Sequence, residues 1–176
     1  TNMALGTTTF SQDQPVNTDW FKEITRTGQY TQNNVSVSGG NESINYFFSA
    51  GYYDEKAILD GLDYSRLTLR NNNDYKISSK IKLSQNLSVT HAKVNPKPFS
   101  AFTNAYKQSP IVPVYYEDGN YGQSILGSNG LVAHAGKDFN FIGNPVQELA
   151  YQDEKIKNIN LSFNFGLDYK ITESIK

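Results

Sequence analysis

The residues best suited to ligand binding are aromatic side chains in a proline- and glycine-rich segment between about 92 and 156. The candidate contacts lie in and around the acidic stretch 117–120: Tyr115, Tyr116, Tyr121, Phe139 and Phe141. Aromatic faces stack on sugar rings, and neighbouring carboxylate and amide groups form hydrogen bonds, so the set suits an oligosaccharide or a peptide groove. The alternative is that these rings only pack the segment onto the structure beneath it.

Groups that could support catalysis or metal binding are sparse. The chain has no cysteine, and its two histidines, His91 and His134, lie far apart. A zinc site would need further ligands that the sequence does not nominate. The stretch 117–120 lacks the spaced oxygen ligands of a calcium loop and is better explained as an Asp-Gly turn. We therefore predict no catalytic residue, no metal and no cofactor.

Charge and hydropathy exclude several classes of protein. There are 16 Lys and Arg residues against 17 Asp and Glu, so no electrostatic attraction to nucleic acid is expected. No run of about 18 apolar residues is present, which excludes a membrane-spanning helix, whereas a transmembrane strand needs only about 9–11 residues. The first residues lack a basic and a hydrophobic signal region, so we expect a mature or internal segment.

Outside the aromatic segment the chain alternates between apolar and polar residues. The clearest example, INLSFNFGLDYKI, is apolar at every odd position from 159 to 171 and polar or glycine at every even one. This period of two predicts β-strands. We expect strands near 29–38, 44–53, 64–76, 80–91 and 157–171.

The connections between these strands alternate between short and long. GGNES (39–43) and ISSK (77–80) are short, whereas 54–63 and 92–156 are long. Outer-membrane β-barrels have tight periplasmic turns at one end and long extracellular loops at the other. A soluble β-sandwich accounts for the alternation but not for this segregation of loop lengths. Tyr75 and Tyr169 near the short turns suit an interfacial aromatic girdle, although tyrosine is also a common strand residue.

Several short motifs, taken in order, resemble the barrel region of SusC/RagA-type TonB-dependent outer-membrane transporters. They are TDW (18–20), RTG (26–28), NNVSVSGG (33–40), YFFSAGY (46–52), RLTLRNNND (66–74), SPIVPVYYEDGNYG (109–122) and NPVQEL (144–149). Each motif alone is weak, but the ordered set is specific and covers roughly residues 16–176.

The resemblance implies an all-β fold, namely about five strands of an antiparallel transmembrane β-barrel, with short periplasmic turns and a long extracellular loop near 92–156. Residues 1–176 would belong to one barrel domain, with the plug domain outside this chain. Plugged transporters have about 22 strands, and an open five-stranded sheet would leave unpaired edges in lipid. We therefore expect a fragment of a longer chain.

The resemblance also implies a function. Proteins of this family import oligosaccharides or peptides across the outer membrane of Gram-negative cells, with a SusD-like lipoprotein lid and the TonB complex, and they are not enzymes. Expected partners are outer-membrane lipid, that lipoprotein, TonB through parts outside this chain, and other outer-membrane proteins. Alternative hypotheses are a carbohydrate-binding soluble β-sandwich and a structural component of an outer-membrane complex.

On this interpretation the polar strand positions face the barrel lumen. The expected lumen-facing residues are Arg66, Arg70, Asn72, Asp74, Asn160, Asn164 and Asp168. Asn71 and Asn73 depart from the pattern, because they occupy positions that should face lipid. Either a neighbouring protein covers them, or a β-bulge shifts the local register.

Overall fold

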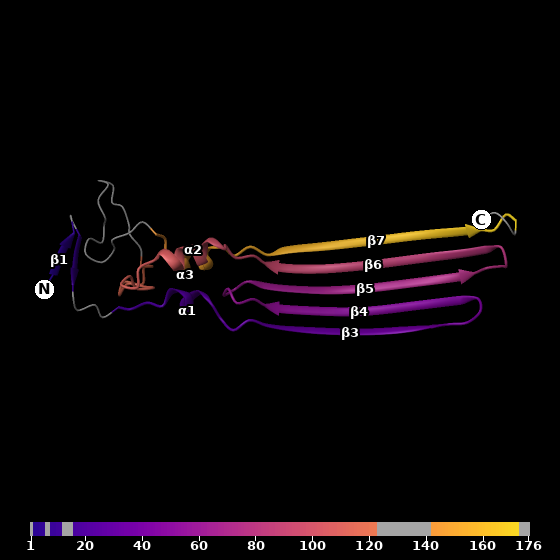
Figure 1. Ribbon diagram of the computed structural model, residues 1–176, viewed down its shortest axis with the longest axis horizontal. Coiled ribbons are helices and arrows are strands. Elements are labelled where there is room, and N and C mark those ends of the chain that lie inside the picture. The colour runs from indigo at the N-terminus through magenta and orange to yellow at the C-terminus, as the bar shows by residue number, and fades with distance from the viewer. Residues whose placement is uncertain (1, 6–7, 12–15, 123–141, 173–176) are drawn as a thin grey trace. The chain divides into compact units, whose positions relative to one another are not determined.

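A computed structural model describes residues 2–5, 8–11, 16–122 and 142–172. The elements, drawn in Figure 1, are β1 (Asn2–Leu5), β2 (Thr8–Ser11), α1 (Trp20–Ile24), β3 (Gln29–Gly40), β4 (Ile44–Lys56), β5 (Asp63–Lys76), β6 (Ile81–Asn95), α2 (Ser100–Lys107), α3 (Pro145–Tyr151) and β7 (Ile156–Tyr169). They form two compact units. Unit 1 comprises 1–27, 57–62 and 96–154, and unit 2 comprises 28–56, 63–95 and 155–176.

Unit 2 is a single antiparallel sheet in which each strand pairs with the next along the chain, in the order β3-β4-β5-β6-β7. Figure 1 shows these long strands side by side, with the tight turns after β3 and β5 at one end, called here the turn end. The opposite end is the long-connection end. The predicted all-β fold with five strands is confirmed. Within the described part of unit 2 no second sheet packs on either face, as a β-sandwich would require.

The strand register is continuous across the whole sheet. Residues pair one to one from Ile44↔Tyr75 to Lys56↔Asp63 between β4 and β5, and the β5–β6 ladder is equally uninterrupted. The suggested β-bulge near Asn71 is therefore wrong. Because paired residues project to the same side of a sheet, the register divides all five strands into one apolar and one polar face.

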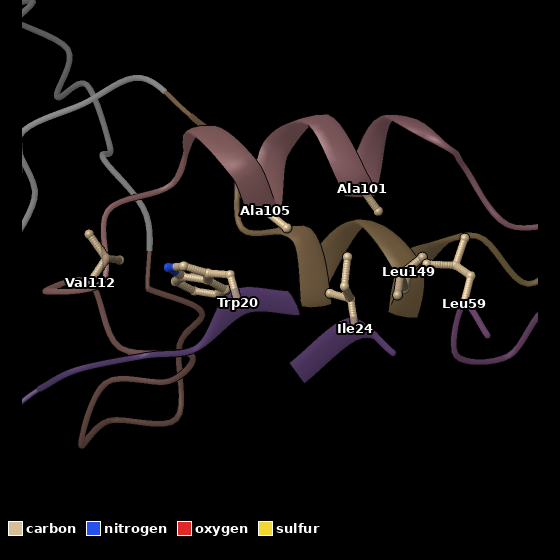
Figure 2. Close-up of a cluster of buried hydrophobic side chains, with 7 residues drawn as sticks. All are labelled: Trp20, Ile24, Leu59, Ala101, Ala105, Val112 and Leu149. Carbon is tan, nitrogen blue, oxygen red and sulfur yellow. The ribbon is translucent and has the colours of Figure 1, made fainter. Parts of the chain in front are cut away.

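Unit 1 is built around a small hydrophobic core, shown in Figure 2. Its buried side chains are Trp20, Ile24, Leu59, Ala101, Ala105, Val112 and Leu149. They come from α1, α2, α3, the β4–β5 connection and the segment after α2, so residues distant in sequence enclose one another. The segment 92–156 was predicted as a loop, yet it includes the end of β6 and two helices. In the described ranges no helix is long and apolar enough to cross a membrane.

Candidate functional site

The TDW motif fastens the start of α1 to the segment that follows α2. Asp19 caps α1, its Oδ1 accepting a hydrogen bond from the backbone N–H of Lys22. Trp20 is 3% exposed, and its Nε1 donates to the carbonyl of Ser109 at 2.8 Å. Thr18 Oγ1 donates to the carbonyl of Val112 at 2.8 Å. The motif thus contributes to the frame of unit 1.

Arg26 of the RTG motif holds the short β4–β5 connection. Its Nε donates to the carbonyl of Ala57 at 3.0 Å, and its Nη2 donates to the carbonyl of Leu62 at 3.1 Å. Nη1 lies 3.5 Å from Oδ1 of Asp60. The planar guanidinium can satisfy all three acceptors at once, which an ammonium group cannot do in this geometry.

The NPVQEL motif begins α3 at a buried polar residue. Asn144 Oδ1 caps the helix by accepting from the N–H groups of Val146 and Gln147, and Pro145 occupies the first turn. Its Nδ2 donates to the carbonyls of Val114 and Gly122, both at 2.9 Å. A single side chain therefore joins the helix to both ends of the aromatic stretch.

Three tyrosines, Tyr115, Tyr121 and Tyr151, form what we call the tyrosine cluster. Tyr115 and Tyr121 are bridged in antiparallel fashion, with ring centroids 4.9 Å apart and an interplanar angle of 37°. Tyr151, at the end of α3, meets Tyr121 edge-on at 6.1 Å and is 75% exposed. Sequence analysis did not nominate Tyr151, because only the fold brings α3 beside this stretch.

The other predicted contacts are placed differently. Tyr116 is 9% exposed and belongs to the interior of unit 1, whereas Phe139 and Phe141 lie outside the described residues. The intervening acidic stretch is a tight turn, in which Gly119 has a φ of 82° and its N–H donates to the carbonyl of Tyr116. Asp118 accepts from the backbone and side chain of Asn120, which agrees with the predicted Asp-Gly turn.

The tyrosine cluster stays uncharged at neutral pH. Desolvation by burial raises the pKa of Tyr121, and a hydrogen bond with Tyr115 raises it further. A neutral phenol retains both a donor and an acceptor. The cluster therefore offers aromatic surface and hydroxyl groups rather than charge.

The apolar face of unit 2 is exposed along its length. On β7 the large apolar side chains of this face extend from Ile159 to Tyr169, and Ile159 is 75% exposed. Matching positions on the other strands are Val35, Val37, Tyr46, Phe48, Tyr52, Leu67 and Leu69. We call this set the apolar band.

The opposite face carries small polar and charged side chains. The register places every expected lumen-facing residue on this face, namely Arg66, Arg70, Asn72 and Asp74 on β5 and Asn160, Asn164 and Asp168 on β7. The row Asn72–Asn86–Asn164 runs directly across three strands. Their position on one face follows from the register, and their contact with a lumen stays a prediction.

The apolar band is interrupted by one group of amides. Asn73 Nδ2 donates to Asn71 Oδ1 at 2.6 Å and approaches Gln85 Oε1 at 3.4 Å. These amides therefore satisfy part of one another's hydrogen-bonding capacity, which lowers the cost of placing them beside apolar groups. Across the described ranges no group of three or more His, Cys, Asp or Glu residues is arranged to hold a metal ion.

Known proteins similar to this chain agree in kind. No family model matches it. The TonB-dependent receptor P26 of Formosa agariphila is 24% identical over 157 residues, which is 89% of this chain and 15% of that receptor. The TonB-dependent receptor SusC of Bacteroides thetaiotaomicron is 26% identical over 179 residues, which is 88% of this chain and 16% of SusC.

Two solved structures share the fold. A chain of the RagAB peptide importer in its closed-closed state gives a TM-score of 0.58 at 17% identity, covering 90% of this chain and 18% of that one. A second structure, of the RagAB peptide transporter, gives 0.57 at 19% identity. This chain thus spans only about 15% of the length of the first curated relative. The resemblance predicted from the motifs is confirmed, and the chain is SusC/RagA-like, corresponding to a segment of a TonB-dependent receptor.

Proposed function

We propose that this chain forms part of the wall of an outer-membrane TonB-dependent nutrient importer of a Gram-negative bacterium. The observation that carries the proposal is the contrast between the two faces of unit 2, with an exposed apolar band on one side and small polar side chains on the other. A barrel wall between lipid and a water-filled lumen requires this contrast.

The dimensions of the apolar band support lipid contact. At about 3.3 Å per residue, the stretch from Ile159 to Tyr169 is roughly 33 Å long. A strand tilt of about 40° reduces this to roughly 25 Å along the membrane normal, which is the height of the apolar band of outer-membrane barrels. In the full protein, β3 and β7 would pair with further strands, because an unpaired edge in lipid costs several kcal/mol per backbone group.

The tyrosine cluster would contact cargo in the long connections. Tyr115 and Tyr151 expose their rings, and such rings stack on sugars or line a peptide groove. We also retain Phe139 and Phe141 as proposed contacts, and leave out Tyr116 because its side chain is buried. A SusD-like lipoprotein would close over the cargo, while TonB would act through parts of the full protein outside this chain, and other outer-membrane proteins would be neighbours.

The test is uptake by cells that carry or lack the full-length gene. Labelled oligosaccharide and peptide mixtures are supplied separately, and depletion from the medium is followed. We expect the deletion strain to lose uptake of one of the two classes, with the protein recovered in the outer-membrane fraction. Unchanged uptake of both classes, with normal outer-membrane localisation, would favour the structural role instead.

A further inference from the structure

We infer that the polar face of unit 2 binds an acidic sugar, meaning a carboxylate- or sulfate-bearing unit of an oligosaccharide, between Arg66 and Arg70. The inference rests on the proposed import function, because it takes the polar face as the one that meets cargo. It adds the chemical class of cargo and the residues that select it.

The site is a hollow over β3, β4 and β5. Its volume is about 390 Å³, within the range of roughly 300–1,000 Å³ typical of ligand sites. Small side chains, Ser49 and Thr68, and the bare backbone of Gly51 form its floor, and Arg66 and Arg70 line it. A Cβ at Gly51 would meet Asn34 Oδ1 at 2.5 Å, so the glycine allows this close approach.

The charge of the hollow is entirely positive. Its lining contains two guanidinium groups and no carboxylate. Arg66 and Arg70 are four residues apart on one face of β5, hence about 13 Å apart along the strand. In the part of the chain that the structure describes, neither makes an ion pair. Unpaired guanidinium groups are strong, often bidentate donors to carboxylate and sulfate oxygens.

Arg66 is held in place by aromatic contact. Its Cζ lies 5.8 Å from the ring centroid of Tyr53, and Tyr53 stacks on Tyr30 with centroids 6.1 Å apart. The carboxylate at this end of the face, Glu55, accepts the Tyr53 hydroxyl hydrogen at 2.7 Å. The guanidinium is therefore positioned before ligand arrives, which lowers the entropic cost of binding.

Hydroxyl and amide groups favour a sugar over a peptide. Besides the arginines, the lining includes Gln32, Asn34, Ser36, Ser49 and Thr68, which can hydrogen-bond to ring hydroxyls. An extended peptide usually binds by adding a strand to a free sheet edge. The backbones of β4 and β5 are paired on both sides, so they offer a peptide no such edge.

The polar face also separates charge along the strands. Arg66 pairs with Tyr53 and Ala92 in the half nearer the long-connection end. The carboxylates of Asp74 and Asp168 lie toward the turn end, where Asp168 pairs with Lys82. In the proposed orientation, anionic cargo would meet the positive half first.

Binding of defined probes to the purified full-length protein tests the inference. Calorimetry compares an oligogalacturonide, which carries carboxylates, with its carboxyl-reduced neutral form, and a sulfated oligosaccharide distinguishes the two anions. The variants are Arg66→Gln, Arg70→Gln and the double substitution. Lys82→Gln is the matched control, since it removes the same charge from the same face outside the hollow.

We expect the native protein to bind at least one acidic probe about tenfold more tightly than the neutral form, with the preference weakening as salt rises. The double variant should lose this preference, and Lys82→Gln should keep it. Equal affinity for acidic and neutral probes, including no binding of either, overturns the inference. So does tighter binding of an oligoglutamate peptide than of both acidic sugars.

A further outcome concerns the full-length chain itself. If the double variant lowers the unfolding temperature of the ligand-free protein but keeps the acidic preference, the arginines pair with carboxylates elsewhere in the protein, and the inference fails. Binding is measured separately from cellular uptake. A protein that binds acidic sugar through the arginines but imports nothing would refute the importer alone.

Discussion

The two units of the chain treat their apolar side chains in opposite ways. Unit 1 encloses seven of them in a core that the chain itself supplies, whereas unit 2 leaves a long apolar band exposed on one face. Unit 1 is therefore specified by protein packing and by buried hydrogen bonds such as those of Asn144. The band of unit 2 needs an apolar surrounding that these residues do not provide, which is what lipid would offer.

The largest expected effect is the loss of the aromatic anchor of unit 1. Trp20→Ala should cost about 3–5 kcal/mol locally, because it leaves a cavity and an unpaired Ser109 carbonyl. Hydrogen exchange at α2 and α3 in the full-length protein should accelerate accordingly. Phe21→Ala is the matched control, since Phe21 is 45% exposed and should cost about 1 kcal/mol or less. Equal effects of the two substitutions would contradict a packed core here.

A charge placed on either face of β7 tests the contrast within unit 2. Phe163 lies in the middle of the apolar band and Asn164 is its neighbour on the polar face. Phe163→Arg should destabilise the barrel by about 2–4 kcal/mol, as expected near the membrane midplane, whereas Asn164→Arg should change stability little. Urea unfolding in lipid vesicles measures both. If the Asn164 substitution proved the more damaging, the assignment of the two faces would be reversed.

The amides within the apolar band allow a finer test. If lipid covers this site, Asn73→Leu should change stability by about 1 kcal/mol or less, because hydrogen bonds between side chains in membranes contribute little on average. If a neighbouring protein covers it, the substitution should weaken that contact, which crosslinking in the native membrane would detect. Asn72→Leu, on the polar face, is the control and should leave the crosslinks unchanged.

The smallest effect is confined to alkaline pH. The pKa of Tyr121 is raised above its ordinary value of 10.0, mainly by desolvation. Its neutral form is thus favoured in the folded state, and this stabilisation is complete below pH 10 and is lost as the pH rises through the folded-state pKa. The difference in unfolding temperature between the native protein and Tyr121→Phe should therefore shrink at high pH. A difference independent of pH would show that Tyr121 acts through packing alone.

The strands were predictable because their signal is local. Alternation from 159 to 171 needs no distant partner to be recognised, and β7 runs over Ile156–Tyr169. The same parity placed Arg66 and Asn164 on one face before any register was known. Asn71 and Asn73 were also recognised as exceptions, but only the uninterrupted pairing excluded a bulge.

Unit 1 was not predictable in this way. α1 has five residues and α3 has seven, which is too short for a period of 3.6 to stand out from sequence. Its core joins Trp20, Leu59 and Leu149 from three separate parts of the chain. Tyr151 was missed as a ligand contact for the same reason, since its proximity to Tyr121 arises only in the fold. The motifs that carried the family resemblance proved to be brackets of this unit, through Trp20 and Asn144.

The unbroken register of unit 2 limits how its sequence can change over evolution. Deleting one residue inside β6 would move every following side chain of that strand to the opposite face, exchanging apolar for polar positions along the ladder. Length changes that preserve the sheet must therefore occur in the connections, or in compensating pairs. Related chains should accordingly keep the strand lengths of this segment almost constant, while the segments that build unit 1 absorb the insertions.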